Sequence, residues 1–183
     1  MIISTQIIGL YTIVRRKLIR MLRMATQVFL PPVITTLLYF MIFGSIMGQR
    51  IGPIEGVNYC LYIAPGLVMM AVITNAYANV STSLFSVRFQ KSIEELLISP
   101  LHYSLILLGY TMGGVLRGVI VAVLVMLVSY CFLDFEFKNL PMTMLVIILV
   151  AALFSLAGFT NGMIARSFDD VALIPTFVLT PLT

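Results

Sequence analysis

Residues 140–165 read LPMTMLVIILVAALFSLAGFTNGMIA and contain no charged side chain. A helix of roughly 20 apolar residues crosses the hydrocarbon core of a bilayer. Helices inside soluble proteins seldom stay free of charge over such a length. This stretch therefore predicts a transmembrane helix.

Three further stretches have the same character. Residues 24–49 and 56–87 are free of charge, and residues 96–133 are interrupted only by Arg117 and the single histidine, His102. The chain is 61% hydrophobic and 10% charged, whereas soluble domains carry about 25% charged residues. These values exclude a soluble domain and predict an all-α membrane protein. The predicted spans are residues 26–48, 59–85, 103–133 and 140–165, followed by the start of a fifth apolar run at Val171.

Ahead of the first span, residues 3–25 have the periodicity of an amphipathic helix. Apolar side chains recur on one face, and Arg16, Arg20 and Arg23 gather on the other. Such a helix lies in the membrane interface with its basic side chains toward anionic headgroups. A basic flank that only fixes topology is the alternative interpretation. We therefore expect an interfacial helix at 1–25 and a transmembrane domain at 26–183.

The basic residues predict the orientation of these spans. With the N-terminus in the cytoplasm, only Arg50 and Lys138 face outside, which agrees with the positive-inside rule. The same placement argues against nucleic-acid binding, because the charges lie at membrane edges and line no groove with stacking aromatics. The basic residues then inside are Arg15, Arg16, Lys17, Arg20, Arg23, Arg88, Lys91 and Arg166.

The segment RFQKSIEELLISPLHY, residues 88–103, separates the second and third spans. Ser92 and Glu95 have the spacing of a capping box, which satisfies the free N–H groups at a helix start. Apolar residues follow, and Pro100 opposes continuation of the helix. A simple connection needs no such helix, whereas a protein that receives force from a cytoplasmic partner does. A solvated loop helix with ordinary capping is the alternative.

Together with strings elsewhere, this segment resembles the coupling helix of ABC-2-type transporter permeases, in particular bacterial inner-membrane exporters. Here it reads Lys91-Ser-Ile-Glu-Glu-Leu-Leu-Ile-Ser-Pro100. The resemblance covers nearly the whole chain. The other agreeing strings are Pro31-Pro32-Val-Ile-Thr, Ala64-Pro65-Gly66-Leu, Asn75-Ala-Tyr-Ala-Asn79, Phe168-Asp169-Asp170 and Pro175-Thr-Phe-Val-Leu-Thr-Pro181-Leu-Thr183.

The resemblance implies a permease of six spans that works as two copies with two cytoplasmic ATP-binding subunits. The sequence has no Gly-x-x-x-x-Gly-Lys-Ser/Thr phosphate loop. ATP and Mg²⁺ would therefore be bound by the partner, and this chain is expected to be a non-catalytic subunit with no cofactor of its own. The residues implied in coupling to the ATPase are Lys91, Ser92, Glu94, Glu95, Leu96 and Leu97.

Against the family's six spans, the last apolar run, residues 171–183, is too short to cross a membrane. This predicts either a transmembrane domain that is incomplete from the fifth span on or a re-entrant segment, and the incomplete domain is favoured. A non-functional permease remnant is then one alternative function. A secondary transporter or channel is another, but it would need intramembrane carboxylates, and the predicted spans contain none.

An intramembrane enzyme or metalloprotein is not indicated. Neither Gly-x-Ser-x-Gly nor His-Glu-x-x-His occurs, and one histidine with two distant cysteines makes no recognisable metal-ligand set. Cys60 and Cys131 both fall near the outer end of a span, and we expect them to be unlinked. Three Gly-x-x-x-Gly pairs, at 109–113, 114–118 and 158–162, predict close helix packing.

Polar residues inside the spans are candidates for a translocation path. Arg117 lies within the third span, where it should face the bundle interior, a partner subunit or water. Asn75, Asn79 and Ser83 follow one stripe of the second span at i, i+4 spacing. Two interpretations stay open: Asn75, Asn79 and Arg117 line a path, or the asparagines make interhelical hydrogen bonds while the arginine snorkels or pairs structurally.

Overall fold

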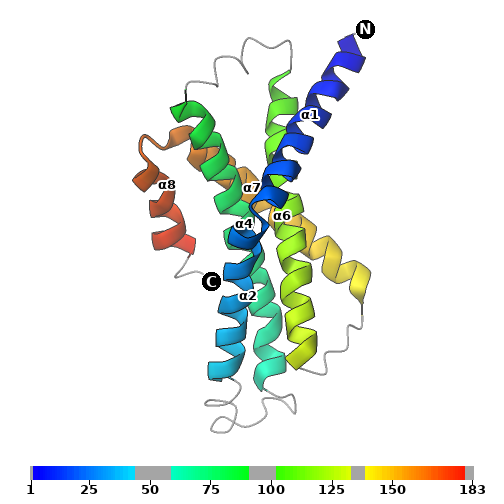
Figure 1. Cartoon of the computed structure of the whole chain (residues 1–183), viewed down its shortest axis with the longest axis vertical. Coiled ribbons are helices and arrows are strands. Elements are labelled where there is room, and N and C mark those ends of the chain that lie inside the picture. The colour runs from blue at the N-terminus through cyan, green and yellow to red at the C-terminus, as the bar shows by residue number, and fades with distance from the viewer. Residues whose placement is uncertain (1, 44–58, 91–101, 133–138, 180–183) are drawn as a thin grey trace.

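The computed structural model describes residues 2–43, 59–90, 102–132 and 139–179. This part of the chain is a bundle of helices (Figure 1). The elements in chain order are α1 (Ile2–Arg23), α2 (Ala25–Ile42), α4 (Tyr59–Phe89), α6 (Tyr103–Phe132), α7 (Leu140–Ile164), α8 (Phe168–Ile174) and the π-helix η2 (Pro175–Leu179).

Four of these helices, α2, α4, α6 and α7, are long and apolar enough to cross a membrane. Both α6 and α7 begin at the predicted residues, Tyr103 and Leu140, and end one residue before the predicted ends. The helix α4 continues beyond residue 85 to Phe89, since no glycine or proline interrupts it there. The all-α membrane fold predicted from the sequence is confirmed, and the predicted end of the first span lies outside the described residues.

The helices α4, α6 and α7 form the core of the bundle, where small residues let the backbones approach. A Cβ added at Gly158 of α7 would lie 2.5 Å from the carbonyl oxygen of Tyr77 in α4. One added at Gly162 would lie 2.9 Å from the carbonyl oxygen of Ser81, also in α4. The close packing predicted for this glycine pair is confirmed. The buried apolar residues at the centre of the core are Val68, Ala71, Val72, Ala76, Val121, Ala122, Val125, Met126, Ile147 and Ala151.

The helices α1 and α2 form an arm that lies along the core and bends at Met24 (Figure 1). The bend follows from the backbone of Met24, whose φ of −107° and ψ of 27° are not helical. Pro31 and Pro32 lie in the second turn of α2, past the first turn where proline is tolerated best. Because proline has no N–H, the carbonyl groups of Gln27 and Val28 lose their usual helical donors.

A capping box starts α8 after the chain turns out of α7. The Ser167 hydroxyl accepts a hydrogen bond from the Asp170 N–H, and the Asp170 carboxylate accepts from the N–H groups of Arg166 and Ser167. These bonds hold the pKa of Asp170 below its usual value. Asp169 and Asp170 lie in the first turn of α8, where their charge suits the positive end of the helix dipole. The fifth apolar run therefore begins inside α8.

Candidate functional site

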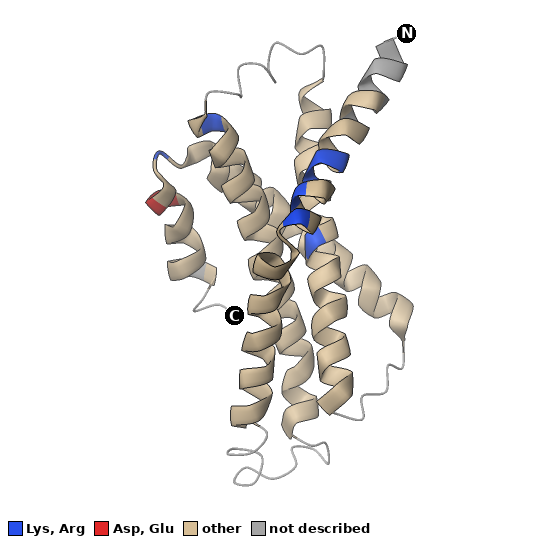
Figure 2. Cartoon of the chain, viewed as in Figure 1, with Lys and Arg blue, Asp and Glu red and all other residues tan. Residues whose placement is uncertain are grey.

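The described cations are concentrated toward one end of the bundle. We call this the Arg88 end, where α4 finishes and α6 begins, and the opposite one the Cys131 end. Every Lys and Arg of the described residues lies in the half of the bundle toward the Arg88 end or near its middle (Figure 2). The described acidic residues, Asp169 and Asp170, start α8 on the same side (Figure 2).

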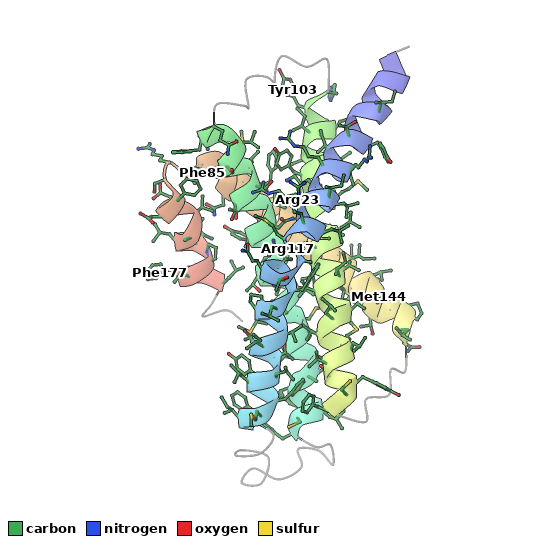
Figure 3. All side chains as sticks on the ribbon, viewed as in Figure 1. Arg23, Phe85, Tyr103, Arg117, Met144 and Phe177 are labelled. Atoms are coloured by element: carbon green, nitrogen blue, oxygen red, sulfur yellow. The ribbon has the colours of Figure 1, made fainter. Side chains whose placement is uncertain are left out.

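Arg117 lies near the midpoint of α6 and turns toward α4 (Figure 3). Its Nη2 donates to Asn75 Oδ1 at 3.1 Å, and its Nη1 lies 3.5 Å from Asn79 Oδ1. Asn79 in turn donates from Nδ2 to the carbonyl oxygen of Gly113 at 3.1 Å. The structure thus brings together the three residues predicted for a translocation path. The asparagines also make the interhelical hydrogen bonds of the alternative interpretation.

The partners of Arg117 are neutral, so they solvate its charge without cancelling it. A cation at the centre of a membrane helix is unfavourable by roughly 2.5–3.5 kcal/mol on insertion scales. The two amide oxygens replace part of the lost hydration. The buried Nε of Arg117, however, has no hydrogen-bond partner among the described residues. The guanidinium is therefore held in place with hydrogen-bonding capacity left over.

A pocket of about 250 Å³ opens beside Arg117, between the arm and the core. Its wall on α2 runs from Gln27 to Tyr39 and includes both prolines of that helix. Asn75 and Arg117 line it from the core side, whereas Asn79 does not. Asn75 and Arg117 are thus exposed to this space, and Asn79 acts within the α4–α6 contact. The other lining residues are Val28, Thr35, Thr36, Leu67, Met70, Ala71 and Thr74.

Ser83, the third residue of the polar stripe on α4, contacts a lysine side chain of the arm. Lys17 Nζ donates to Ser83 Oγ at 2.7 Å and lies 3.6 Å from the centroid of the Tyr110 ring. Burial, and then the neighbouring Arg20 guanidinium, lower the pKa of Lys17 to about 7. The ring contact and the hydroxyl favour the charged form and act in the opposite direction. Lys17 therefore holds α1 against the core, and its lowered pKa means that it can gain or lose its proton near neutral pH.

Arg88 ties α4 to the end of α7. Its Nη1 is within hydrogen-bonding distance of the carbonyl oxygens of Gly162, Met163 and Ala165. These carbonyl groups have lost their helical donors because α7 ends there. A guanidinium suits this position, since it offers several donors and its charge is favourable at a helix C-terminus. Arg88 therefore joins the ends of α4 and α7 through polar contacts.

An aromatic cluster joins α8 to the same place. The Phe168 ring meets that of Phe85 at 4.7 Å between centroids and that of Phe89 at 5.2 Å, both edge to face (Figure 3 labels Phe85). Asn161 of α7 donates from Nδ2 to the carbonyl oxygen of Val171 at 3.2 Å. The last turns of α4, the end of α7 and the start of α8 thus form one connected unit, which we call the Arg88 cluster.

The six residues implied in ATPase coupling, from Lys91 to Leu97, lie outside the described residues, and so does the predicted capping box of Ser92 and Glu95. Their flanks are described. The last described residue of α4 before them is Phe89, directly after Arg88, and Tyr103 begins α6 at the same end of the bundle (Figure 1). The segment therefore departs from the Arg88 cluster.

Other predicted features can be placed more briefly. Cys60 is buried, Cys131 is exposed, and neither forms a disulfide. Among the residues that the structure describes, no group of His, Cys, Asp and Glu side chains could hold a metal ion.

Two important contacts were missed from the sequence. Lys17 and Arg88 were interpreted only as topological charges, whereas each makes specific contacts with another helix. For Lys17 a signal existed, since it is separated from Met21 by one helical turn and Met21 is buried. For Arg88 the signal was weaker, because the end of α7 that it contacts is far away in the sequence.

Comparison with known proteins identifies relatives along nearly the whole chain. A family model described as ABC-2 type transporter matches residues 9–183. The inner membrane transport permease YadH of Escherichia coli K12 is 49% identical over 176 residues, which cover 96% of this chain and 69% of the relative. The YadH permease of Shigella flexneri is similar to the same extent. No solved structure matches. With this match spread over nearly its whole length, the chain belongs to the ABC-2 type transporter family.

Proposed function

We propose that this chain is the membrane-spanning permease subunit of an ATP-binding-cassette exporter in the inner membrane. Family membership and the similarity to the inner membrane transport permease YadH support a permease of that membrane. The observation that carries the mechanism is the Arg88 cluster, which fastens the departure point of residues 91–101 to α7. ATP and Mg²⁺ are bound by a separate cytoplasmic subunit, and a second copy of the permease completes the transporter.

In this proposal the Arg88 end faces the cytoplasm. The cations of the described residues are concentrated on that half of the bundle (Figure 2), and the positive-inside rule assigns such a half to the cytoplasm. The N-terminus is then cytoplasmic as well, and α1 lies near the inner interface with its exposed arginines toward anionic headgroups.

Coupling is mechanical. The short helix predicted around Lys91, Ser92, Glu94, Glu95, Leu96 and Leu97 binds the ATPase and moves when the ATPase dimer closes. Arg88, only three residues from Lys91, transmits that movement to the end of α7, because its guanidinium holds backbone carbonyl groups there. The rings of Phe85 and Phe89 transmit it to Phe168 at the start of α8. The core then moves against the arm, and the pocket between them, which Asn75 and Arg117 line, forms part of the translocation path with Asn79 behind it.

The coupling role is tested by co-purification. The tagged chain is extracted from its own membranes with a mild detergent, and ATP hydrolysis in the purified material is measured. We expect a Glu94→Ala, Leu97→Arg double variant to lose the co-purifying ATPase, because an acidic and an apolar contact are both removed.

The matched control is Glu136→Ala with Phe137→Arg, which makes the same chemical changes in the connection between α6 and α7. That variant should keep the ATPase. If the first double variant retains ATPase at the wild-type level, the coupling role of residues 91–97 is wrong.

A further inference from the structure

The positive charge of Arg117 is not neutralised by a negative charge within the described bundle. Its described hydrogen-bond partners are the amide oxygens of Asn75 and Asn79, and its Nε has none. The carboxylates of the described part of the chain, Asp169 and Asp170, are in the first turn of α8, and that of Asp170 accepts hydrogen bonds there. Arg117 therefore keeps a full positive charge and an unused donor in a low-dielectric region.

The pocket beside Arg117 has the right chemistry to receive a negative group. All three of its threonine hydroxyls already donate to the chain's own carbonyl groups, Thr35 to Pro31, Thr36 to Pro32 and Thr74 to Met70. The donors that remain on its wall are Arg117, the Gln27 amide and the Tyr39 hydroxyl, and the described contacts include no hydrogen bond from either of the last two side chains. A cavity with spare donors and one net cation favours an oxyanion over a neutral or cationic group.

The shape of the pocket favours an elongated molecule. Gln27 and Tyr39 are twelve residues apart on α2, which corresponds to about 18 Å along a helix at 1.5 Å per residue. Apolar side chains, Leu67, Met70 and Ala71, line the opposite wall between the polar groups. Such a space accepts an apolar chain while a charged group is held at Arg117.

We propose that this pocket binds a phosphate group, with the guanidinium of Arg117 as the principal contact. The planar guanidinium can donate two parallel hydrogen bonds to phosphate oxygens, and these are stronger than bonds to the neutral amides. The assignment of this molecule to transport rests on the proposed function, whereas its binding does not. The phosphate can come from a lipid headgroup or from a free anion, and the two sources are distinguished experimentally.

The absence of tryptophan from the chain makes a single introduced tryptophan a specific reporter. Leu67→Trp places it on the pocket wall and keeps every polar side chain there. The full chain carrying this reporter is reconstituted in phosphatidylcholine vesicles, and brominated phosphatidylglycerol or brominated phosphatidylcholine is added as quencher. We expect phosphatidylglycerol to bind about tenfold more tightly. Both lipids offer a phosphate, but phosphatidylcholine also brings a choline cation close to the unbalanced charge of Arg117.

Arg117→Gln in the reporter background should abolish this headgroup preference. The matched control is Arg23→Gln, which removes an exposed arginine of the arm that does not line the pocket and should keep the preference. Thr35→Phe fills the pocket without changing its charge and should also abolish it, so the proposal stays testable if Arg117→Gln does not fold.

A second arm uses inorganic phosphate on the same protein in a neutral detergent. A saturable change in tryptophan emission that is lost in Arg117→Gln assigns the site to free phosphate. Its absence, with lipid preference retained, assigns the site to the headgroup. The proposal is overturned if neither arm shows a preference, if Arg117→Gln leaves the response unchanged, or if Arg23→Gln removes it equally. Because no ATPase is present, these outcomes are independent of the co-purification test.

Discussion

The helices α4 and α7 pack backbone against backbone, whereas the α1–α2 arm, which packs on α6, reaches α4 through a long side chain and across a pocket. In the core, Gly158 and Gly162 leave no room for a Cβ against the carbonyl oxygens of α4. In the arm, Lys17 reaches across to Ser83 and Tyr110, and a polar pocket separates much of α2 from α4. The contact of α7 with α4 leaves no space at either glycine, whereas the contact of the arm with α4 involves far fewer residues.

This difference has a physical origin in the membrane. Lipid chains are as apolar as leucine, so helices gain little by hiding apolar side chains from them. Close van der Waals contact between small residues and polar bonds between helices then decide which helices stay together. The core has both, since Arg88 adds hydrogen bonds at the end of the α4–α7 contact. We therefore infer that the core moves as a unit and that the arm is the part that can shift.

The largest effect on stability is expected at Gly158, where α4 leaves no room for a Cβ atom. Gly158→Ala should lower the free energy of unfolding by about 3 kcal/mol, because the added methyl group would meet the backbone of Tyr77 rather than a flexible side chain. The measurement is the thermal unfolding midpoint of the purified chain in detergent.

Gly66→Ala is the matched control, because a Cβ there meets nothing within 4 Å. Alanine also favours the helix, so this variant should be unchanged or more stable by about 0.5–1 kcal/mol. Equal midpoints for the two variants would show that the α4–α7 contact is not limited by space.

A smaller effect on stability is expected at Arg88, whose guanidinium joins α4 to the end of α7. Arg88→Ala leaves the last carbonyl groups of α7 without their donor, which should cost about 2 kcal/mol locally. Hydrogen exchange of the backbone amides of α8 should become faster, since α8 packs on the same cluster. Arg166→Ala removes an exposed arginine nearby and should leave exchange unchanged; faster exchange in both variants would contradict the assigned role of Arg88.

The smallest effect is expected at the contact between arm and core. Burial, and then Arg20, lower the pKa of Lys17 to about 7, so between pH 7 and 10.5 the unfolded chain holds more protons than the folded one. Stability contributed by this site should therefore rise with pH in that window and be constant below it. The Tyr110 contact reduces the slope, and we expect a gain of about 1 kcal/mol between pH 7.5 and 9.

Unfolding midpoints at several pH values provide this measurement. Lys17→Met should lose the rise, while Arg23→Gln should keep it because Arg23 is exposed. A rise of the same size in Lys17→Met would assign the pH dependence to other groups.

The contrast between core and arm also explains what the sequence could predict. Long apolar runs fixed the limits of α6 and α7, and the spacing of Asn75, Asn79 and Ser83 correctly placed them on one face. Both signals are local. The partners of that face were not predictable, because the contact of Lys17 with Tyr110 and that of Arg88 with α7 depend on how distant helices cross. A charge near a span looks the same in sequence whether it fixes topology or binds another helix.

The proposed mechanism requires residues 91–101 to be the cytoplasmic attachment point of the ATPase. Lys91→Cys, in a chain with Cys60 and Cys131 replaced by alanine, is treated with a membrane-impermeant maleimide in intact cells and in inverted inner-membrane vesicles. We predict labelling only in the inverted vesicles, and protection there when the ATPase is bound. Labelling of Lys91→Cys in intact cells would place this segment on the opposite side of the membrane and contradict the proposed mechanism.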